Sequence, residues 1–539
     1  MIGNPLSLTA EQSAAMIGTA NVFLTACPGS GKTRSIAGRV AWHLSEDRRL
    51  ALLSHTNVGA EEIARAVTSS TGQTLPASSY VGTLHSFASR YILRPYGHLV
   101  TGASQPISVV DGAEDEEYRF SVTGDLLQTR SRISVPYAQA LENRRESARR
   151  GEVGHDGALY WSLVTLQRFP TIARALAQRF SEIIVDEAQD SNELQLAILE
   201  VIRNAGLPSL VMVGDFDQSI YGFGGANPDL CRATAARCGL TTVPLNENHR
   251  SSQAICDVAA QFRSQRTPDR AVGPDKDFGL KPRVVRYPAG HPEAVIDYFK
   301  RRVTGIGGTA DESVVVTRNN ALATRLSGQP TGKLPSALRA LLEAKRATPS
   351  VTMDLVSGIE DALLRASFGS AAAGLLMDSG VMRSAAMHLI GDLPDIAGNI
   401  ATWAAAAESV LNFHASALSP ATASPIELDV PRAMRGVSLD AQPAASNLFR
   451  VETVYKVKGE SVDASMLVAS EPTEDWHRSD AESWSAPLSL QASAASDEVR
   501  LCYVALTRAR RLAVIALPDS TSSSLVERFV AAGFEEDPV

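Results

Sequence analysis

The sequence predicts an α/β protein built on parallel β-sheets. Several short apolar runs have the length and composition of buried strands. They lie at 21–25, 50–54, 181–185 and 209–214. A glycine-rich turn joins the first run to a helical pattern, and polar or acidic residues follow each of the others. Parallel sheets bind ligands beyond the carboxyl ends of their strands, so we expect the functional residues there.

The turn after the first strand reads Ala-Cys-Pro-Gly-Ser-Gly-Lys-Thr at 26–33. Gly29 and Gly31 let the backbone amides curl around a phosphate chain at a helix N-terminus. Lys32 can reach the outer phosphates, and the Thr33 hydroxyl can bind Mg²⁺. The first position is Ala rather than Gly, so the match is to a relaxed phosphate-loop pattern. The alternative is an ordinary glycine-rich turn that enters a helix.

The bulk composition narrows the class of protein. At 539 residues the chain is long enough for about three to five domains. A net charge of −8 argues against a protein that coats duplex DNA by bulk positive charge, although it is compatible with a local nucleic-acid groove. No apolar run is long enough to span a membrane, and the N-terminus lacks the pattern of a secretory signal. Five scattered cysteines without a CxxC pair predict neither a zinc site nor disulfides, and we expect a cytoplasmic protein.

Polar residues ahead of the phosphate loop and after the next strands have two interpretations each. Thr9 and Gln12 have the spacing of a capping box, whereas the Gln12 amide could also read an adenine edge. Residues 55–57 (His-Thr-Asn) and 83–85 (Thr-Leu-His) could hold a nucleic-acid strand or serve ordinary turns. The arginine-rich stretch 144–150 predicts a solvated helix face, with phosphate contact as the alternative.

An acidic pair follows the strand at 181–185. Asp186 can hold Mg²⁺, and Glu187 can orient and deprotonate an attacking water. A chance Asp-Glu pair after a strand is common, but here the same chain also carries Gly-Lys-Thr. The two motifs together predict nucleotide hydrolysis.

The strand at 209–214 ends in a loop with its own chemistry. Gln218 could sense a terminal phosphate, and Arg250 offers a cation at a later turn. Tyr221 and Phe223 are aromatic residues of this loop. They could stack on bases or close a local core.

In their order along the chain, these blocks resemble the motifs of superfamily 1A helicases, the UvrD/Rep/PcrA family. Three later blocks resemble the family's C-terminal motifs: Val314–Asn319, Thr453–Glu460 and Val499–Ala509. The resemblance therefore runs over nearly the whole chain. It implies two RecA-like parallel-sheet domains of the P-loop NTPase class, ATP and Mg²⁺ as cofactors, and single-stranded or tailed duplex DNA as partner, with 3′→5′ polarity.

The resemblance also implies a role for each matching residue. The implied catalytic residues, with two arginine fingers last, are Lys32, Asp186, Glu187, Gln218, Arg250 and Arg508. The implied ATP contacts are Gln12, Ala26, Pro28, Gly29, Ser30, Gly31, Lys32, Thr33, Arg34, His249 and Glu460. Mg²⁺ is implied at Thr33 and Asp186. DNA contacts are implied at Thr56, Asn57, Thr83, His85, Tyr221 and Phe223.

Four departures from the family pattern affect mainly the DNA track. His249 replaces a Tyr that stacks on adenine, and His55 replaces a Phe. Tyr455 replaces a His, and Gly224 replaces an Arg. Every position implied in phosphate chemistry is retained.

The motif order predicts a domain organisation with two mostly helical insertions. Core domain 1A comprises 1–87 and 181–245, with insertion 1B at 88–180. Core domain 2A comprises 246–320 and 446–539, with insertion 2B at 321–445. A flexible loop is expected at 416–425, and after Arg511 we expect one strand and a short helix, with no room for a fused nuclease.

The predicted function is an ATP-dependent DNA helicase or translocase in DNA repair or antiphage defence. The alternative is a DNA-sensing ATPase subunit that regulates a separate nuclease without processive unwinding. In its compact size, this chain resembles the helicase-like subunits of Gabija-type antiphage systems. A phosphate-loop ATPase without a nucleic-acid role is the third interpretation.

Overall fold

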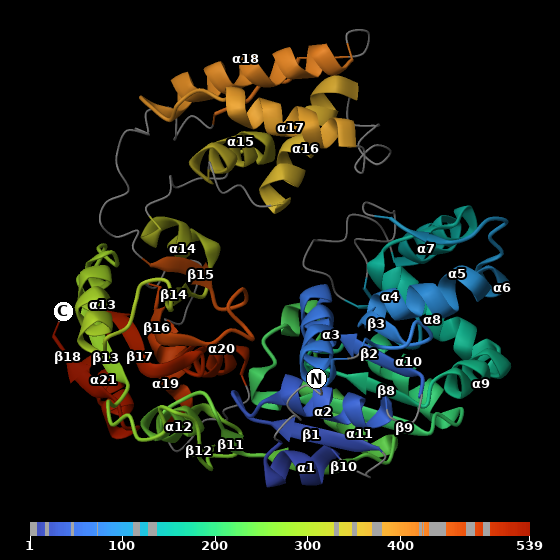
Figure 1. Ribbon diagram of the computed structural model, residues 1–539, viewed down its shortest axis with the longest axis horizontal. Coiled ribbons are helices and arrows are strands. Elements are labelled where there is room, and N and C mark those ends of the chain that lie inside the picture. Colours follow the sequence, from blue (N-terminus) through green and yellow to red (C-terminus); the bar gives the residue numbers. More distant parts are fainter. Residues whose placement is uncertain are drawn as a thin grey trace. The chain divides into compact units, whose positions relative to one another are not determined.

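The computed structural model describes most of the chain in two compact units. Residues are described at 8–16, 21–44, 48–72, 74–110, 119–127, 137–327, 334–347, 353–368, 380–419, 423, 425–430, 449–470, 480–488 and 496–538. The first unit takes in 1–291, 298–318 and 454–539, and the second takes in 292–297 and 319–453. Both large sheets have strands in the first unit (Figure 1).

The first sheet has six parallel strands in the order β10-β1-β9-β8-β2-β3. Their bounds are β1 Val22–Ala26, β2 Leu50–Ser54, β3 Tyr80–Thr83, β8 Glu182–Val185, β9 Ser209–Gly214 and β10 Thr241–Leu245. Leu50 and Leu52 pack on one face, whereas Ala51 and Leu53 pack on the other. Burial of both faces explains why these strands are continuous apolar runs.

Helices cover both faces of this sheet (Figure 1). On one face, α2 (Lys32–Leu44) and α3 (Asn57–Thr71) contribute Ile36 and Ile63 to the core. On the other, α8 (His155–Arg168), α9 (Pro170–Arg179) and α10 (Glu193–Asn204) contribute to a larger core. The remaining helices on this part of the chain are α1 (Ala10–Met16) and α11 (Pro228–Arg237). These helices cover the sheet on both faces. Because the strands are parallel, the carboxyl ends of β1, β8 and β9 lie at the same edge of the sheet.

A buried charge cluster lies at the opposite, amino-terminal end of β8. The Glu182 carboxylate accepts hydrogen bonds from Arg39 Nε at 2.8 Å and Ser209 Oγ at 2.5 Å, and His43 Nε2 lies 3.0 Å from it. The side chains of Glu182, Arg39 and His43 are almost fully buried. Although burial opposes the charge, hydrogen bonds from Arg39 and His43 lower the pKa of Glu182 to about 2. The folded protein therefore holds this carboxylate ionised.

We expect Glu182→Gln to lower the free energy of unfolding by about 3 kcal/mol, because one partner of a buried ion pair is removed. The folded pKa lies below the ordinary value of 4.5, so the stabilisation is present above pH 4.5 and is lost as the pH falls towards 2. Urea unfolding of Glu182→Gln, with the exposed Glu61→Gln on α3 as control, measures this difference. Equal stability of the two variants at pH 7 would contradict the prediction.

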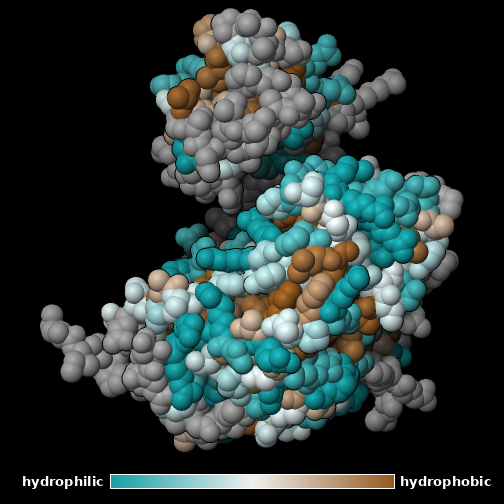
Figure 2. Space-filling view, turned by 90° about the vertical axis from the view of Figure 1, so that its right-hand side faces the viewer, coloured by the Kyte–Doolittle hydropathy of each residue, from teal (hydrophilic) through white to brown (hydrophobic). Residues whose placement is uncertain are grey.

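Residues 84–180 add a mostly helical layer with small β-ribbons. Its helices are α4 Leu84–Ala88, the π-helix η1 Ser89–Leu93, α5 Arg94–Tyr96, α6 His98–Thr101 and α7 Tyr137–Arg150, followed by α8 and α9. Its strand pairs are β4 Ser108–Val109 with β7 Glu152–Val153, and β5 Arg119–Phe120 with β6 Leu126–Leu127. In the larger body of Figure 2, hydrophobic residues gather in the middle of the visible face and hydrophilic residues surround them.

The arginine-rich helix α7 corrects one expectation. Arg144 does not lie on a solvated face: its guanidinium sits 4.0 Å from the centre of the Phe120 ring and 4.1 Å from that of Tyr160. It also donates to the Gly124 carbonyl at 3.2 Å. Arg145 and Arg149 remain exposed. Arg144 is therefore a core cation held by aromatic faces, which neither interpretation of the sequence included.

The second sheet also has six strands, in the order β15-β14-β16-β17-β13-β18. Their bounds are β13 Arg283–Tyr287, β14 Ser313–Thr317, β15 Arg450–Thr453, β16 Val462–Val468, β17 Ala509–Pro518 and β18 Glu535–Asp537. Helices of this part are α12 Gln253–Ala259, α13 Ala294–Gly305, α14 Asn320–Leu326, α19 Asp480–Ser485, α20 Asp497–Leu506 and α21 Ser523–Ala531. A small pair, β11 Glu247–Asn248 with β12 Arg270–Ala271, precedes them.

The C-terminal strand β18 was missing from the sequence prediction of one strand and a short helix after Arg511, which is therefore wrong. β18 pairs in parallel with β13 at the edge of the sheet. Asp537 meets Arg283 at 3.4 Å, Tyr298 at 2.7 Å and the Arg302 guanidinium. An acidic strand has no apolar pattern, and these cations stabilise it from outside its own segment.

The helical part of the second unit packs around its own core. Its helices are α15 Ser336–Ala347, α16 Met353–Phe368, α17 Gly380–Asp392 and α18 Ile400–Leu418. Leu341, Leu363, Leu389 and Trp403 are buried together there. Because α18 continues to Leu418, the loop expected from 416 begins later; 420–422 and 424 lie outside the described residues. Within the described parts of the chain, no helix combines the length and apolar character that a membrane span requires.

Candidate nucleotide and nucleic-acid sites

The turn between β1 and α2 has the geometry of a phosphate loop. Gly29 and Gly31 have φ of 73° and 76°, a conformation that favours glycine. A Cβ at Gly29 would lie 2.5 Å from the Arg250 Cβ, and one at Gly31 would lie 2.7 Å from the Gln12 amide nitrogen. Both glycines are thus required by backbone shape and by close neighbours. Their loop opens at the N-terminus of α2, where a helix favours anions.

Gln12 fits the capping interpretation and also contacts the loop. Its side-chain oxygen accepts from Thr9 N at 3.1 Å, and its own backbone N donates to Thr9 Oγ1 at 3.2 Å. The amide nitrogen of Gln12 donates to the Ser30 carbonyl at 2.9 Å. The capping box is therefore formed, and the same side chain ties α1 to the phosphate loop.

The acidic pair after β8 lies against Lys32. Lys32 Nζ is 3.1 Å from Glu187 Oε1, and Gln189 Nε2 donates to Glu187 Oε2 at 2.5 Å. Glu187 has φ of 51°, a left-handed conformation that is uncommon for a non-glycine residue. The buried Asp186 Oδ1 has no hydrogen-bond partner among the described residues. Strain and an unpartnered carboxylate oxygen in one turn are typical of a functional site.

The charges of this pair are set by burial and by the neighbouring ammonium groups. Burial and the adjacent Glu187 charge raise the pKa of Asp186 to about 7. Although burial opposes it, Lys32 and Lys458 hold the pKa of Glu187 well below its usual range. Glu187 is therefore ionised at neutral pH. The two carboxylates are driven apart in pKa, as expected for residues with separate tasks.

Two arginines from later parts of the chain, Arg250 and Arg508, reach the same region. Arg508 Nη2 donates to Gln218 Oε1 at 3.0 Å, and Arg250 Nη1 donates to the Thr507 carbonyl at 2.9 Å. Burial lowers the pKa of Arg508 to about 10, and burial together with the Arg508 charge lowers that of Arg250 to about 9. Among the described residues, neither guanidinium has a carboxylate partner. Two such cations side by side are suited to an anionic ligand.

The residues present fit a nucleoside triphosphate with Mg²⁺. The glycine cradle, the unpartnered Asp186 Oδ1 and a similarly unpartnered, buried Ser30 Oγ supply donors and an acceptor. Thr33 is the second residue of α2, directly after Lys32, the position in a phosphate loop from which a hydroxyl would ligate the cation. The described residues contain no cluster of three or more His, Cys, Asp or Glu that could hold a metal without the nucleotide. A Mg²⁺ ion bound with the nucleotide would be held by Thr33, Asp186 and phosphate oxygens.

Other predicted ATP contacts lie around this loop. His249 N donates to the Gly29 carbonyl at 2.9 Å, and the Glu460 carbonyl accepts from Arg508 Nη1 at 3.2 Å. Ala26 ends β1 and Pro28 is buried beside it, whereas Arg34 is exposed on α2. Their contacts with a nucleotide remain predictions.

We expect Lys32→Ala to abolish detectable nucleotide binding at concentrations that saturate the wild-type protein. Its ammonium group is the cation of the phosphate loop, and removal also leaves Glu187 without its 3.1 Å partner. Titration with a fluorescent ATP analogue measures the loss, and thermal unfolding without nucleotide shows that the variant is folded. Wild-type affinity in a folded Lys32→Ala protein would contradict the assignment.

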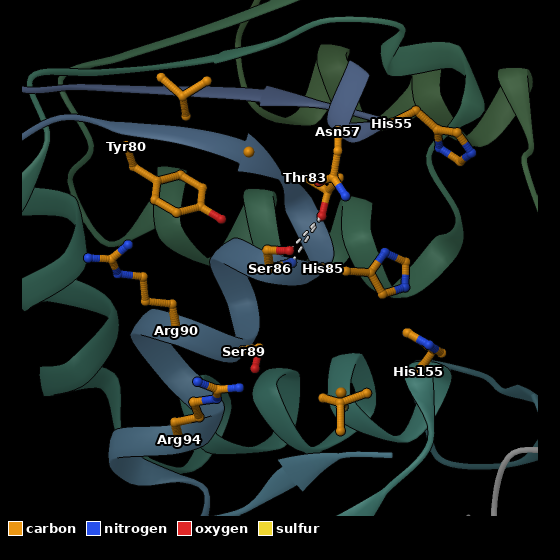
Figure 3. Close-up of a pocket in the computed structure, with 14 residues that line it drawn as sticks. His55, Asn57, Tyr80, Thr83, His85, Ser86, Ser89, Arg90, Arg94 and His155 are labelled. Carbon is orange, nitrogen blue, oxygen red and sulfur yellow. Dashed lines mark hydrogen bonds between the residues drawn. The ribbon is translucent and has the colours of Figure 1, made fainter. Parts of the chain in front are cut away.

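A separate groove of about 770 Å³ opens beyond β3 (Figure 3). Its lining is rich in hydroxyl, amide, imidazole and guanidinium groups: His55, Asn57, Thr83, His85, Ser86, Ser89, Arg90, Arg94 and His155. The π-helix η1 brings Ser89 and Arg90 to it, and π-helices are frequent at functional sites. Hydroxyls, imidazoles and guanidinium groups are suitable for a phosphodiester backbone.

Several predicted DNA contacts line this groove while also serving the local fold. Thr83 caps α4 by accepting from Ser86 N at 3.1 Å, and Thr56 caps α3 by accepting from Gly59 N at 3.1 Å. Thr83 and Asn57 line the groove, as does His85. Burial and the neighbouring His155 lower the pKa of His85 to about 4, so its imidazole is neutral at pH 7. It would therefore contact a strand as a neutral hydrogen-bonding group.

Tyr221 is not among the residues that line the groove, but its ring contacts His55, which is. Tyr221 also lies next to Tyr455 and Lys458. Its ring stacks on His55 at 5.2 Å, and its hydroxyl donates to the Tyr455 carbonyl at 3.2 Å. The Lys458 ammonium lies 4.9 Å from the Tyr221 ring centre. The side chain of Phe223 lies outside the described residues.

The sequence analysis missed several residues that the fold brings to these sites. Lys458 bonds the Asp190 carboxylate and donates to the Gln218 carbonyl at 2.8 Å, so it links the acidic loop to the loop of Tyr221. Arg119 donates to the Gly224 carbonyl and pairs with Asp156 at 3.3 Å. An arginine from a distant segment thus reaches the loop in which Gly224 replaces the family's Arg. No local pattern around Arg119 signals this contact.

Comparison with known proteins agrees with this geometry. The family model of the UvrD/REP helicase N-terminal domain matches residues 8–150 and 137–237, which hold the phosphate loop, the acidic pair and the groove. The matched part of the chain is similar to the UvrD/REP helicase family. The chain is 28% identical to the ATP-dependent DNA helicase PcrA of Leuconostoc citreum over 275 residues, covering 44% of this chain and 36% of that protein.

Two further relatives have similar sequence identities and coverages. DNA helicase II of Haemophilus influenzae is 28% identical over 293 residues, covering 47% of this chain and 39% of its own length. The ATP-dependent DNA helicase UvrD1 of Mycobacterium leprae is 26% identical over 371 residues, covering 58% and 47%. The chain thus spans less than half the length of these relatives. The similarity to UvrD/REP helicases agrees with the resemblance seen in the sequence, and the α/β fold with two parallel sheets agrees with the predicted fold class.

Proposed function

We propose that this protein is an ATP-driven DNA motor, a helicase or single-strand translocase. One contact carries the proposal. Arg508, which directly precedes β17, donates a hydrogen bond to Gln218, beside the Lys32–Glu187 pair. This contact joins a cation that directly precedes β17 of the second sheet to the loop that follows β9 of the first. Such an arrangement is complete only when both parts of the site are together, which is what a nucleotide-dependent motor requires.

The chemistry follows from the charges of the side chains. Ionised Glu187 orients the attacking water and accepts its proton. Lys32, Arg250 and Arg508 neutralise the charge that develops on the phosphate oxygens. Bound Mg²⁺ would add further neutralisation at oxygens held near Thr33 and Asp186. Gln218, fixed between Arg508 and Asp215, places its amide between the two halves of the site.

The coupling to DNA would pass through Lys458 and Tyr221. Lys458 contacts the Asp190 carboxylate on the acidic loop and lies over the Tyr221 ring. Tyr221 in turn stacks on His55, a member of the groove lining. A change at the acidic loop during hydrolysis would therefore move aromatic groups that face a DNA strand. Alternating contact with the strand would give directed stepping, with 3′→5′ polarity by resemblance.

The test is ATP turnover with and without single-stranded DNA, beside unwinding of 3′-tailed and 5′-tailed duplexes in Mg²⁺-ATP. We expect DNA to stimulate turnover and the 3′-tailed duplex to be unwound. Turnover that ignores DNA would overturn the nucleic-acid role and leave only a phosphate-loop ATPase.

A second candidate is a DNA-sensing ATPase subunit that controls a partner nuclease, in repair or antiphage defence. The substituted DNA-track residues His55, Tyr455 and Gly224 and the net charge of −8 favour it. DNA-stimulated turnover without any unwinding, together with co-purification of a nuclease, supports this candidate. Unaided unwinding by the purified monomer contradicts it.

A further inference from the structure

The guanidinium of Arg263 lies near a cluster of three buried carboxylates and contacts two of them, Asp217 and Asp269. Arg263 follows the 3₁₀-helix η5 (Ala260–Phe262) and donates to Asp269 Oδ1 at 2.6 Å. Its Nε lies 3.5 Å from Asp217 Oδ2. Asp215, Asp217 and Asp269 are each less than 10% exposed: 5%, 8% and 6%. Neither the motif pattern nor the chemistry proposed above assigns a task to Arg263.

The residue after Arg263 strengthens its hold on Asp217. Ser264 N donates to Asp217 Oδ1 at 3.0 Å, and Ser264 Oγ donates to Asp217 Oδ2 at 3.2 Å. Asp217 N in turn donates to Asp215 Oδ1 at 3.0 Å. The segment 263–264 therefore fixes the start of the loop that follows β9.

From Asp215 the contacts lead directly into the nucleotide site. Asp215 Oδ2 accepts from Gln218 Nε2 at 2.8 Å and from the Tyr503 hydroxyl at 3.3 Å. With its nitrogen held by Asp215, the Gln218 amide presents its oxygen to Arg508 Nη2 at 3.0 Å. The orientation of that amide thus depends on an ionised Asp215.

The cluster needs Arg263 to stay ionised. Burial raises the pKa of Asp215, and the Arg263 charge opposes this rise. Burial likewise raises the pKa of Asp269 to about 6, again opposed by Arg263. Without the guanidinium, three carboxylates would share a buried space with no cation in contact, and one or more would take up a proton. A protonated Asp215 loses acceptor capacity towards Gln218 and Tyr503.

We propose that Arg263 is a positioning residue for ATP hydrolysis, which holds Asp215 and Asp217 so that the Gln218 amide oxygen meets Arg508. The inference rests on the proposed ATPase function. It assigns Arg263 an effect on turnover rather than on nucleotide binding, because within the described parts of the chain Arg263 contacts Asp217, Asp269, the Thr267 carbonyl and the Tyr503 ring but neither the glycine loop nor Lys32. A purely structural Arg263 would instead change stability and leave the turnover of the folded protein unchanged.

The experiment compares Arg263→Gln and Arg263→Lys with the wild-type protein in kcat, in KM for ATP and in thermal unfolding. We expect Arg263→Gln to lower kcat by about 10- to 100-fold, as for a displaced catalytic group, with KM changed less than about threefold. Arg263→Lys keeps the charge and is expected to recover most of the loss. The control is Arg286→Gln on β13, which removes an arginine whose partner is Glu536.

Tyr503→Phe gives a second, milder test, because it removes one hydrogen bond to Asp215 and leaves Arg263 in place. We expect a smaller fall in kcat, and a double variant with Arg263→Gln that loses less than the sum of the two effects. A folded Arg263→Gln protein with wild-type kcat overturns the inference. If Arg263→Gln does not fold, unchanged kcat in both Arg263→Lys and Tyr503→Phe overturns it. Absence of ATP turnover in the wild-type protein contradicts the proposed function itself, and is a distinct result.

Discussion

Replacing Glu187 by glutamine is expected to reduce ATP turnover by about 10²- to 10⁴-fold while nucleotide binding is retained. The variant keeps the size of the side chain and its hydrogen-bonding capacity, but it cannot accept a proton. The Lys32 ammonium, 3.1 Å from Glu187 in the wild type, is released to a bound phosphate. Binding is therefore expected to be at least as strong as in the wild type.

The charge state of Glu187 makes this prediction specific. Although burial opposes it, Lys32 and Lys458 keep the pKa of Glu187 low, so the base is already deprotonated before substrate binds. Asp186, whose buried Oδ1 has no hydrogen-bond partner among the described residues, is the better candidate for holding the cation. Asp186→Asn should accordingly change the Mg²⁺ dependence of turnover.

The measurement is single-turnover ATP hydrolysis beside titration with a fluorescent ATP analogue. Glu193→Gln, at the start of α10, is the matched control because it makes the same chemical change outside the site. Normal turnover in Glu187→Gln would refute the assignment of this residue as the base. Loss of both binding and turnover would mean that Glu187 acts mainly by holding the loop in shape.

Much of the first sheet could be predicted from the sequence, because strands that are buried on both faces are continuous apolar runs. The strands β2 and β9 begin and end where the apolar runs at 50–54 and 209–214 do. The glycine-rich turn was equally readable, since positive φ at Gly29 and Gly31 is a local property of the backbone. Such features depend on a few neighbouring residues.

Features that depend on distant partners could not be read in this way. Arg144 is buried because Phe120 and Tyr160 offer their ring faces, and β18 forms because Arg283 and Arg302 meet its carboxylates. No periodicity within α7 or β18 encodes those partners. Family resemblance can suggest that two motifs share a site, but it does not indicate which atoms meet.

The contact between Arg508 and Gln218 is the clearest case of such long-range dependence, and it leads to the second large effect. We expect Arg508→Ala to reduce kcat by about 10³-fold with little change in ATP affinity, the loss typical of a removed arginine finger. Arg508 is almost fully buried, and it donates to Gln218, to the Thr507 hydroxyl and to the backbone carbonyls of Val504 and Glu460. Because no carboxylate among the described residues pairs with Arg508, its charge can stabilise the transition state.

The carbonyl contacts mean that Arg508→Ala also removes packing, so a second substitution separates the two effects. Arg508→Lys keeps the charge but cannot contact Gln218 and both carbonyls at once, because an ammonium is compact whereas a guanidinium is a planar fork. We expect it to recover stability and only part of the rate. Arg510→Ala, two residues along β17 and paired with Asp463 at 3.1 Å, is the control. If Arg508→Ala and Arg510→Ala lose turnover equally, the contact with Gln218 has no catalytic role, and the two sheets do not meet in a shared nucleotide site.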